Sequence, residues 1–395
     1  MDLAAGLIAH SKLPAAGTTI FTVMSALAQR YGAVNLGQGF PDYPIDPELI
    51  DRVTAAMRAG YNQYPLMPGV LALREAIARK VERLYGRAYD PVDEITVTSG
   101  ATQAIFTTLQ ALAHPGDEVI VFEPAYDSYI PAVRLAGATP VPLPLTFPDF
   151  RIDWALVRKA ITPRTRLILV NTPNNPGTSA LSAEDLDALA ELTDGTPIAI
   201  VSDEVYEHMV YDGARHESLA RHPALAPRSV VIGSFGKTFH ATGWKVGYAL
   251  APRALTAEIR RVHQFMVFTV SSPMQHALAG FLEDPRHYEA LPAFFTAKRD
   301  LLRRALADVP LDLLPCEGSY FQLATYAKVS DAPADVFAET LVRDHGVAVI
   351  PLSAFYHDRT DHRVIRFCFA KKEETLRAAA ERLRTLVPRL QARGG

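Results

Sequence analysis

Cysteine is scarce in this chain of 395 residues, which has only Cys316 and Cys368. So few cysteines exclude a disulfide-stabilised scaffold, and their separation fits no common zinc-binding spacing, so we expect both to be reduced packing residues. Long apolar runs are also absent, because none approaches the roughly 20 residues that a membrane helix needs. Residues 1–6 lack the basic segment of a secretory signal peptide. We therefore expect a cytoplasmic protein that does not associate with membranes.

An excess of charge of one sign is lacking as well. The chain has 40 basic and 43 acidic residues, which leaves no overall field to attract nucleic acid or an anionic membrane. No His-Glu-x-x-His zinc motif and no Gly-x-Ser-x-Gly elbow occurs. The segment Gly236-Lys237-Thr238 resembles the end of a nucleotide-binding P-loop, but Val231 stands where that loop requires a glycine. We expect neither a metal site nor a nucleic-acid partner.

Short apolar runs alternate with amphipathic stretches between residues 95 and 250. The runs that we interpret as strands are 95–98, 119–122, 139–143, 167–170, 198–201, 230–232 and 246–250. Amphipathic stretches at 101–113, 126–135 and 186–192 are interpreted as helices between them. This alternation predicts an α/β fold with a mostly parallel seven-stranded sheet that has helices on both faces.

The two ends of the chain have a different pattern. Strands are expected at 320–326, 347–350 and 364–369, with helices near 334–343 and 373–386, which predicts a smaller α+β domain. The first 45 residues are rich in glycine and proline, so we expect an arm that has only short elements. The predicted units are an arm at 1–45 that joins the small domain, a large domain at 46–285 and a small domain at 286–395.

Polar residues follow four of the expected strands. In an open α/β sheet, ligands bind beyond the carboxyl ends of the strands. The four segments are Ser99-Gly100-Ala101-Thr102, Asn171 to Gly177, Ser202 to Tyr206, and Ser234 to Thr238 with Lys237. Each residue alone has an ordinary explanation, such as a helix cap, a turn residue or a solvated loop lysine. Their joint placement at strand ends favours a shared binding site.

This set of side chains suits pyridoxal phosphate. The aldehyde of that cofactor needs a lysine, its ring nitrogen needs a buried carboxylate, and its phenolic oxygen needs hydrogen-bond donors. Its phosphate needs a helix start and a cation. Lys237, Asp203, Asn175 with Tyr206, and the segment that begins at Gly100 would meet these needs.

Several segments together resemble the class I aminotransferases of fold type I, which depend on pyridoxal phosphate. The run from Ser234 to Gly247 is similar to the lysine motif of that family, and Asn171 to Pro176, Ser202 to Tyr206 and Gly37 to Asp42 resemble further family segments. The similarity covers nearly the whole chain. Within the family, the sequence is most similar to methionine aminotransferases, followed by the kynurenine and glutamine transaminase K group.

The resemblance implies roles for individual residues. The implied catalytic residues are Lys237, Asp203 and Tyr206. The implied cofactor contacts are Gly100, Ala101, Thr102, Tyr126, Asn175, Asp203, Tyr206, Ser234, Lys237 and Lys245, with Tyr64 reaching the site of a neighbouring subunit. The implied substrate contacts are Gly39, Asn175, Arg366, Phe21, Phe40 and Phe268, and Tyr320 and Phe355 are further aromatic positions near the pocket. Many family members carry arginine where Lys245 stands, so a point charge would replace a fork there.

The predicted function is amino-group transfer from methionine or another apolar or aromatic amino acid to a 2-oxo acid. The resemblance implies ping-pong kinetics and a homodimer with shared active sites. An alternative on the same scaffold is a carbon-sulfur β-lyase that acts on cysteine conjugates. A non-catalytic, cofactor-dependent regulator is less favoured, because the chain has no spare length for a DNA-binding module.

Overall fold

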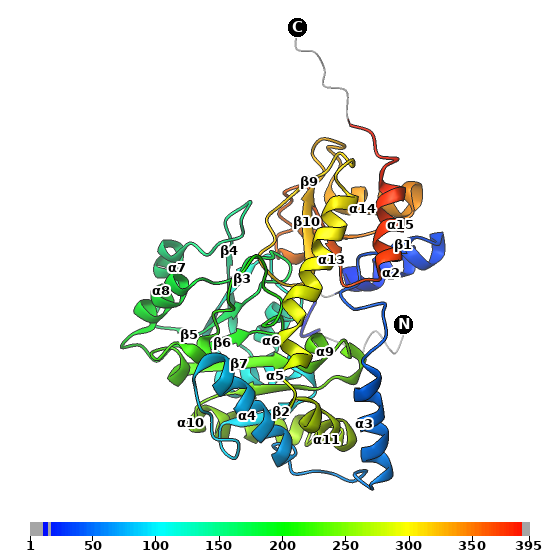
Figure 1. The fold of residues 1–395 in the computed structure, drawn as a ribbon. Helices are drawn as coiled ribbons and strands as arrows, with labels where there is room; N and C mark the ends of the chain where they lie inside the picture. Colours follow the sequence, from blue (N-terminus) through cyan, green and yellow to red (C-terminus); the bar gives the residue numbers. More distant parts are fainter. Residues whose placement is uncertain (1–10, 15–16, 389–395) are drawn as a thin grey trace, which may run out of the picture.

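The computed structural model describes residues 11–14 and 17–388. Residues 1–6, on which the expected absence of a signal peptide depends, therefore lie outside the described residues. Figure 1 shows a larger lobe around the main sheet and a smaller lobe around a second sheet, with the long helix α13 (Leu291–Ala305) running between them. Within the described part of the chain, no helix is long and apolar enough to cross a membrane.

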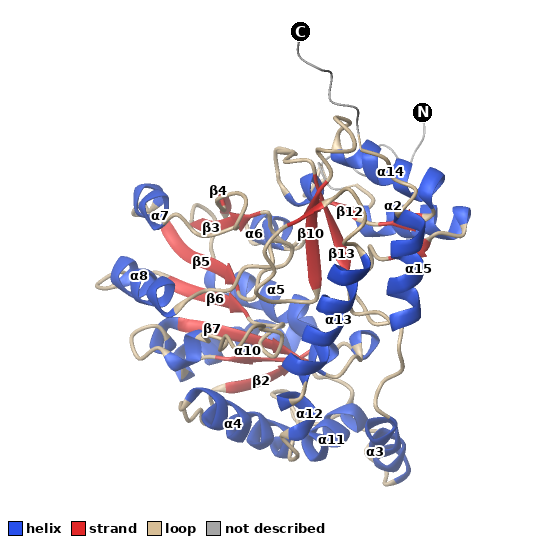
Figure 2. Ribbon diagram, turned by 45° about the horizontal axis from the view of Figure 1, so that its top comes forward, coloured by secondary structure: helices blue, strands red, loops and turns tan. Residues whose placement is uncertain are grey.

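The main sheet has seven strands, and all seven expected strands are confirmed. In spatial order they are β2 (Ile95–Thr98), β8 (Gly247–Leu250), β7 (Ser229–Ser234), β6 (Ala199–Asp203), β5 (Thr165–Asn171), β3 (Glu118–Glu123) and β4 (Thr139–Pro144). Strand β8 runs antiparallel to both of its neighbours, and the other pairs are parallel. The predicted mostly parallel sheet is therefore correct (Figure 2).

Helices cover both faces of this sheet, and the alternation of side chains along a strand explains why. Val119 and Val121 of β3 belong to one apolar core, and Ile120 and Phe122 belong to the other. The first core contains residues of α5 (Gly100–Leu112), α6 (Tyr129–Leu135) and α10 (Arg253–Met266). The second contains residues of α4 (Leu71–Tyr85), α7 (Trp154–Ala160), α8 (Ala183–Thr193) and α11 (Ser272–Phe281). Each fully buried Val, Ile or Phe contributes about 1.5–3 kcal/mol, so both faces hold the sheet in place.

The smaller lobe contains a four-stranded antiparallel sheet. Its strands are β12 (Ile350–Pro351), β13 (Val364–Cys368), β10 (Phe321–Thr325) and β9 (Asp312–Leu313), in that order. Helices α14 (Ala334–His345) and α15 (Glu373–Leu383) complete this lobe. The single strand expected at 347–350 is wrong, because β11 (Val347–Ala348) pairs with β1 (Val34–Asn35) whereas β12 pairs with β13. The chain changes partners at Val349, which belongs to neither strand.

The expectation of only short elements in the first 45 residues is also wrong. Helix α2 (Ile20–Tyr31) has three turns, and it begins where the Thr19 side chain accepts a hydrogen bond from Thr22 N. It ends at Gly32, whose φ of 59° lies in the left-handed region. The glycines and prolines that suggested an interrupted arm lie outside this stretch. Because β1 pairs with β11, this segment joins the smaller lobe, and the domain boundaries near 45 and 285 remain predictions.

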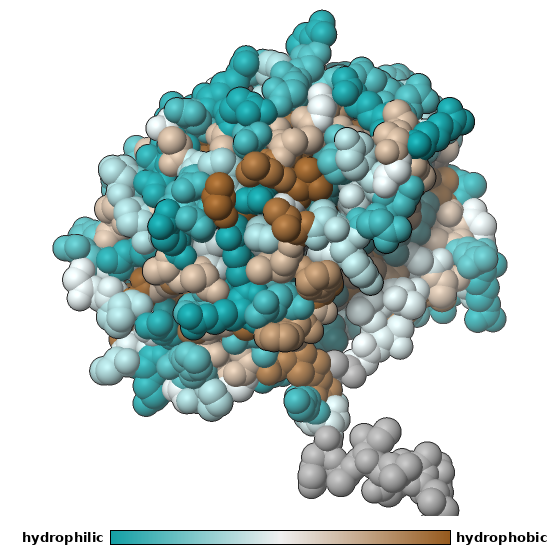
Figure 3. Space-filling view, turned by 90° about the horizontal axis from the view of Figure 1, so that it is seen from below, coloured by the Kyte–Doolittle hydropathy of each residue, from teal (hydrophilic) through white to brown (hydrophobic). Residues whose placement is uncertain are grey.

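Three further helices are α3 (Pro47–Arg58), the short α9 (Phe235–Thr238) and α12 (Arg286–Glu289). Figure 3 shows apolar surface on the lower face of the molecule, the side on which α3, α10 and α11 lie in Figure 1. Exposed apolar side chains in and next to α3 and α10 include Met57, Tyr61, Tyr64, Leu66, Phe265 and Phe268. Exposed apolar surface of this kind is typical of an interface with another protein.

Candidate active site

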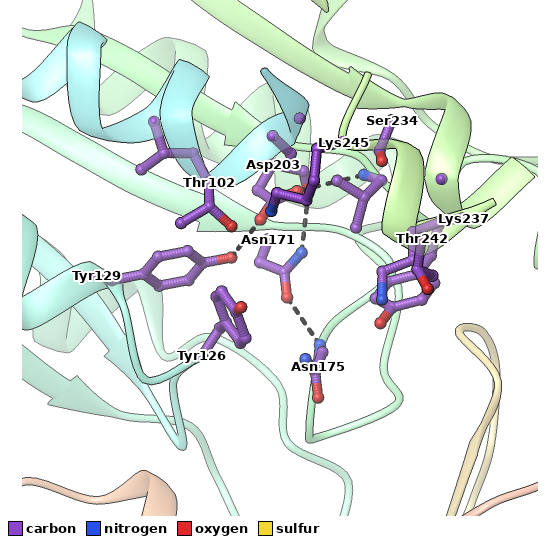
Figure 4. A pocket seen from close by; sticks show the side chains of 16 residues that line it. Thr102, Tyr126, Tyr129, Asn171, Asn175, Asp203, Ser234, Lys237, Thr242 and Lys245 are labelled. Atoms are coloured by element: carbon purple, nitrogen blue, oxygen red, sulfur yellow. Dashed lines mark hydrogen bonds between the residues drawn. The ribbon is translucent and has the colours of Figure 1, made fainter. Parts of the chain in front are cut away.

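A cavity of about 150 Å³ lies beyond the carboxyl ends of β5, β6 and β7, next to the start of α5 (Figure 4). The residues predicted to bind the cofactor line this cavity, with the exception of Tyr64. They are Gly100, Ala101, Thr102, Tyr126, Asn175, Asp203, Tyr206, Ser234, Lys237 and Lys245. Segments that are far apart in the sequence therefore meet at one edge of the sheet, as the strand-end argument predicted.

Lys237 lies on α9, the short helix that follows β7 directly. Its Nζ atom donates hydrogen bonds to the carbonyl oxygen of Gly39, at 3.2 Å, and to the hydroxyl of Tyr320, at 2.8 Å. Burial lowers the pKa of Lys237 to about 8, and the nearby Arg366 acts in the same direction. A much larger share of this amine is therefore neutral at pH 7 than for an ordinary lysine. A neutral amine is a nucleophile and a base.

Asp203 is the last residue of β6 and is buried. Its Oδ2 atom accepts a 2.6 Å hydrogen bond from the Tyr129 hydroxyl, and its Oδ1 atom accepts one from Val205 N. Burial nevertheless raises the pKa of Asp203 to about 6. A carboxylate in such a place is stabilised by a cationic partner, and the protonated ring nitrogen of a pyridine is a partner of this kind.

The start of α5 forms a cradle for an anion. Gly100 has a φ of 74°, which favours glycine, and no side chain caps the first turn of the helix. A Cβ atom at Gly100 would lie 3.5 Å from Nζ of Lys245, so this amine lies close to the free backbone N–H groups. The hydroxyl-bearing residues Thr102 and Ser234 line the same cavity. Helix start, cation and hydroxyls together fit a phosphate group.

Asn171 connects two of the predicted site residues (Figure 4). Its Nδ2 atom donates to the carbonyl oxygen of Asp203 at 2.9 Å, and its Oδ1 atom accepts from Asn175 N at 2.7 Å. The sequence prediction included Asn171 in a motif but gave it no role. The structure shows that it fixes the backbone of Asn175 relative to β6.

Arg366 lies on β13, in the smaller lobe, and is almost completely buried. Its Nη1 atom donates to Oδ1 of Asn175, and its Nη2 atom donates to the carbonyl oxygen of Gly37 at 3.3 Å. Its Nε atom has no hydrogen-bond partner among the described residues. An unpaired buried donor next to the cavity fits the carboxylate of a substrate, which a guanidinium binds with two parallel hydrogen bonds.

Aromatic rings surround this guanidinium. The Cζ atom of Arg366 lies 3.8 Å from the ring centroid of Phe321, 5.0 Å from that of Phe355 and 5.4 Å from that of Phe21. Phe21 is thus near the predicted carboxylate site. The other predicted aromatic contact of this lobe, Phe40, is 45 % exposed, and its ring lies 4.8 Å from Nζ of Lys371.

Tyr64 and Phe268 are not brought to the cavity within one chain. Tyr64 is 82 % exposed and Phe268 is 47 % exposed. Their ring centroids lie 5.4 Å apart, in an edge-to-face arrangement. Both roles remain predictions.

Two tyrosines in the site were not anticipated in their present roles. Tyr129 donates a hydrogen bond to Asp203, and its only sequence signal is its position three residues after Tyr126. Tyr320 was expected only as an aromatic ring near the pocket, whereas its hydroxyl contacts the Lys237 amine. No local pattern could reveal that contact, because the two residues are brought together by the fold.

Comparison with known proteins decides the family. The sequence model described as aminotransferase class I and II matches residues 31–383. This chain belongs to the class I and II aminotransferases. It is 51% identical to the methionine aminotransferase of Escherichia coli (strain K12), over 96% of this chain and 99% of the relative. It is 36% identical to kynurenine–oxoglutarate transaminase 1 of Rattus norvegicus, over 91% of this chain and 93% of that protein.

Solved structures agree with the family. An Escherichia coli structure with a reported methionine aminotransferase function superimposes with a TM-score of 0.94 at 51% identity, covering 95% of this chain and 99% of that one. The aspartate aminotransferase of Thermus thermophilus with maleate gives a TM-score of 0.87 at 31% identity, covering 95% and 98%. The aminotransferase has fold type I, and its family depends on pyridoxal 5'-phosphate. The buried Asp203, the Lys237 amine and the cradle at α5 fit this cofactor on their own geometry.

Proposed function

We propose that this aminotransferase moves the amino group of methionine, or of another amino acid with an apolar or aromatic side chain, to a 2-oxo acid by a ping-pong mechanism. The observation that carries the proposal is the guanidinium of Arg366, which has an unpaired Nε atom and lies among Phe21, Phe321 and Phe355. A carboxylate clamp in apolar surroundings suits an amino acid without a second charge. The name of the Escherichia coli relative supports methionine as the donor.

The residues of the cavity divide the chemistry among them. When bound, pyridoxal 5'-phosphate supplies an aldehyde and an electron-accepting ring. Lys237 would hold the cofactor, and its free amine would serve as the base that takes a proton from the substrate α-carbon. Asp203 would keep the ring nitrogen protonated. Tyr206 and Asn175 would donate to the phenolic oxygen, and Tyr126 would pack against the ring.

Anchoring and orientation come from groups at the cavity edge. Lys245, the start of α5 and the hydroxyls of Thr102 and Ser234 would hold the phosphate. Arg366 would bind the substrate carboxylate, and Gly39 would contact the same carboxylate through its backbone. With both ends held, the α-carbon is presented to the Lys237 amine, and this positioning accounts for much of the rate.

A donor panel tests the proposal. Initial rates with one 2-oxo acid acceptor are compared for methionine, phenylalanine, kynurenine and glutamate. We expect methionine or an aromatic amino acid to give a kcat/KM at least about tenfold above that of glutamate, because one unpaired buried charge costs more than 1.4 kcal/mol. A preference for glutamate would reject the substrate assignment while leaving the family unaffected. Release of pyruvate and ammonia from cysteine conjugates, without an aminated cofactor, would instead indicate a β-lyase.

A homodimer with shared active sites is part of the proposal. Tyr64 and Phe268 form an exposed aromatic pair, and Leu66 and Phe265 add further exposed apolar surface. A second copy that covers this surface would bury these rings and bring Tyr64 toward the partner's phosphate. The reduced cysteines and the composition are consistent with a cytoplasmic location, which we also propose.

Complementation tests the shared site. Lys237→Ala and Tyr64→Ala subunits are each assembled alone and then mixed after dissociation. A mixed dimer contains one complete site, with Lys237 from the Tyr64→Ala subunit and Tyr64 from the Lys237→Ala subunit. We expect activity to reappear in the mixture above that of either variant alone. If the subunits have exchanged and the activity of the mixture is only the sum of the activities of the two variants, the active sites are not shared.

A further inference from the structure

The hydroxyl of Tyr320 contacts the amine of Lys237. Tyr320 is fully buried, immediately before β10. Its hydroxyl accepts a 2.8 Å hydrogen bond from Nζ of Lys237 and donates one to the carbonyl oxygen of Gly39. Lys237 Nζ also donates to that carbonyl, at 3.2 Å. The amine, the phenol and the carbonyl thus form a closed triangle of hydrogen bonds.

This triangle joins three separate segments. Gly39 lies against Tyr320 and Phe321, since a Cβ atom at Gly39 would be 3.0 Å from Cζ of Phe321. Ser319, next to Tyr320, has a φ of 65°, a conformation that costs a residue other than glycine about 1 kcal/mol or more. Backbone strain adjacent to a side chain that contacts a reacting atom is typical of a functional site.

We infer that Tyr320 is a catalytic residue that orients the free amine of Lys237 for proton transfer. A neutral amine has two N–H bonds and one lone pair. The two N–H bonds are directed at the hydroxyl oxygen of Tyr320 and the carbonyl oxygen of Gly39. The lone pair is then the only part of the Lys237 nitrogen that is free to accept a proton, and it is held in a fixed direction. The N–H bond that forms there replaces the substrate C–H bond, whose electron pair stays with the substrate and cofactor.

The inference rests on the proposed function, in which Lys237 is the base. It adds a second phenol to the site, distinct from Tyr206, whose ring centroid lies 5.0 Å from that of Tyr320. The charged or titratable groups that act on the Lys237 amine are Cys368, Arg366, Asp203 and Lys245. A change confined to the Tyr320 hydroxyl leaves all four in place.

Tyr320→Phe removes the hydroxyl and keeps the ring. Tyr211→Phe is the matched control, because the Tyr211 hydroxyl donates to the carbonyl oxygen of Ser319 and does not contact Lys237. The first readout needs no turnover: the pKa of Lys237 is measured in the cofactor-free full chain from the pH dependence of its acetylation. We expect this pKa to fall by about one unit in Tyr320→Phe, because a hydrogen-bond acceptor for the ammonium is lost. It should not change in Tyr211→Phe.

The second readout is kinetic. In the cofactor-loaded enzyme, we expect Tyr320→Phe to lower kcat about tenfold to hundredfold. This loss is smaller than the loss expected when the general base itself is removed. The isotope effect with α-deuterated methionine should rise, while the KM for methionine and the cofactor content stay close to wild type. A merely structural role would not raise the isotope effect.

The outcomes separate the inference from the proposed function. An unchanged Lys237 pKa and an unchanged isotope effect in Tyr320→Phe, in an enzyme that transaminates, would overturn the role of Tyr320 alone. Equal changes in Tyr211→Phe would overturn it too. Failure of the wild-type enzyme to form a 2-oxo acid would overturn the proposed function, and the pKa readout would still report on the contact.

Discussion

The hydroxyl of Tyr129 donates a 2.6 Å hydrogen bond to Oδ2 of Asp203, and both side chains are buried. This bond favours the ionised form of a carboxyl group whose pKa burial has raised to about 6. The Tyr129 hydroxyl therefore influences the protonation state of Asp203, the proposed partner of the ring nitrogen. For this reason, the affinity for the cofactor should depend on pH.

The ionised carboxylate binds the protonated ring, so cofactor affinity should weaken as pH falls through the pKa of Asp203. For the wild-type protein, we expect the acid limb of affinity against pH to be centred near 6. Tyr129→Phe removes a hydrogen bond to the charged form, which raises that pKa and moves the limb up by about one unit. Titration of cofactor into the cofactor-free chain measures this affinity at each pH. Tyr326→Phe is the control, because the Tyr326 hydroxyl donates to the carbonyl oxygen of Ala332 and not to Asp203. An unmoved limb would show that Asp203 is not the group that titrates.

A buried ion pair stabilises the segment that carries Tyr206. Glu207 accepts from Lys80 Nζ and from the Tyr85 hydroxyl, each at 2.5 Å, and from the Tyr248 hydroxyl at 2.8 Å. Burial alone would raise the pKa of Glu207, but Lys80 and these hydrogen bonds hold it far below its ordinary value of 4.5. The resulting stability is thus present above pH 4.5 and is lost as pH falls further.

Glu207→Gln should lower the free energy of unfolding at pH 7 by about 3–5 kcal/mol, because it leaves the Lys80 ammonium buried without a counter-charge. Denaturant titration measures this, and the deficit should shrink below pH 4. The double variant with Lys80→Met should recover part of the loss. Wild-type stability of Glu207→Gln at pH 7 would contradict a stabilising role for this ion pair.

Arg366→Lys tests the carboxylate clamp with a matched pair of substrates. A lysine cannot provide two parallel N–H groups, so we expect kcat/KM for methionine to fall about tenfold to hundredfold. For 3-(methylthio)propylamine, which is methionine without its carboxylate, the low rate should be unchanged. An equal loss with both compounds would indicate that the variant disturbs packing against Phe321 instead.

Lys245→Asn separates the charge of Lys245 from its backbone. The φ of Lys245 is 55°, which asparagine tolerates better than most residues, so the variant removes the ammonium with little added strain. We expect the affinity for pyridoxal 5'-phosphate to fall about tenfold to hundredfold, and the affinity for pyridoxal, which has no phosphate, to stay constant. A parallel loss of pyridoxal binding would contradict a phosphate contact.

Much of the large lobe could be predicted because its strands are buried on both faces. Runs such as Val119 to Phe122 and Val230 to Ile232 are apolar without interruption, which is typical of a parallel sheet. Strand ends then identified Asp203, Ser234 and Lys237 together. The predicted helix at 126–135 begins later, at Tyr129, because the chain after Pro124 first forms an irregular segment beside the cavity.

The smaller lobe was harder to predict because its elements depend on distant partners. Two-residue strands such as β1 and β11 exist only through their mutual pairing, and nothing local identifies them. Helix α2 was not predicted because glycines and prolines on both sides of it dominate the composition of this segment, although the stretch between Gly17 and Gly32 contains neither. The hydroxyl contacts of Tyr129 and Tyr320 likewise arise from tertiary packing.

The most direct test of the central claim, that Lys237 and its neighbours form a transaminating site, is a visible spectrum of the cofactor-loaded enzyme. Methionine is added without any 2-oxo acid, and the Lys237→Ala chain is measured in parallel. We predict that the band of the lysine-bound cofactor disappears, that one equivalent of 2-oxo acid forms per site, and that a second 2-oxo acid restores the band. In Lys237→Ala, no turnover should follow. A band that persists with methionine and with the aromatic amino acids, or full turnover by Lys237→Ala, would contradict the account.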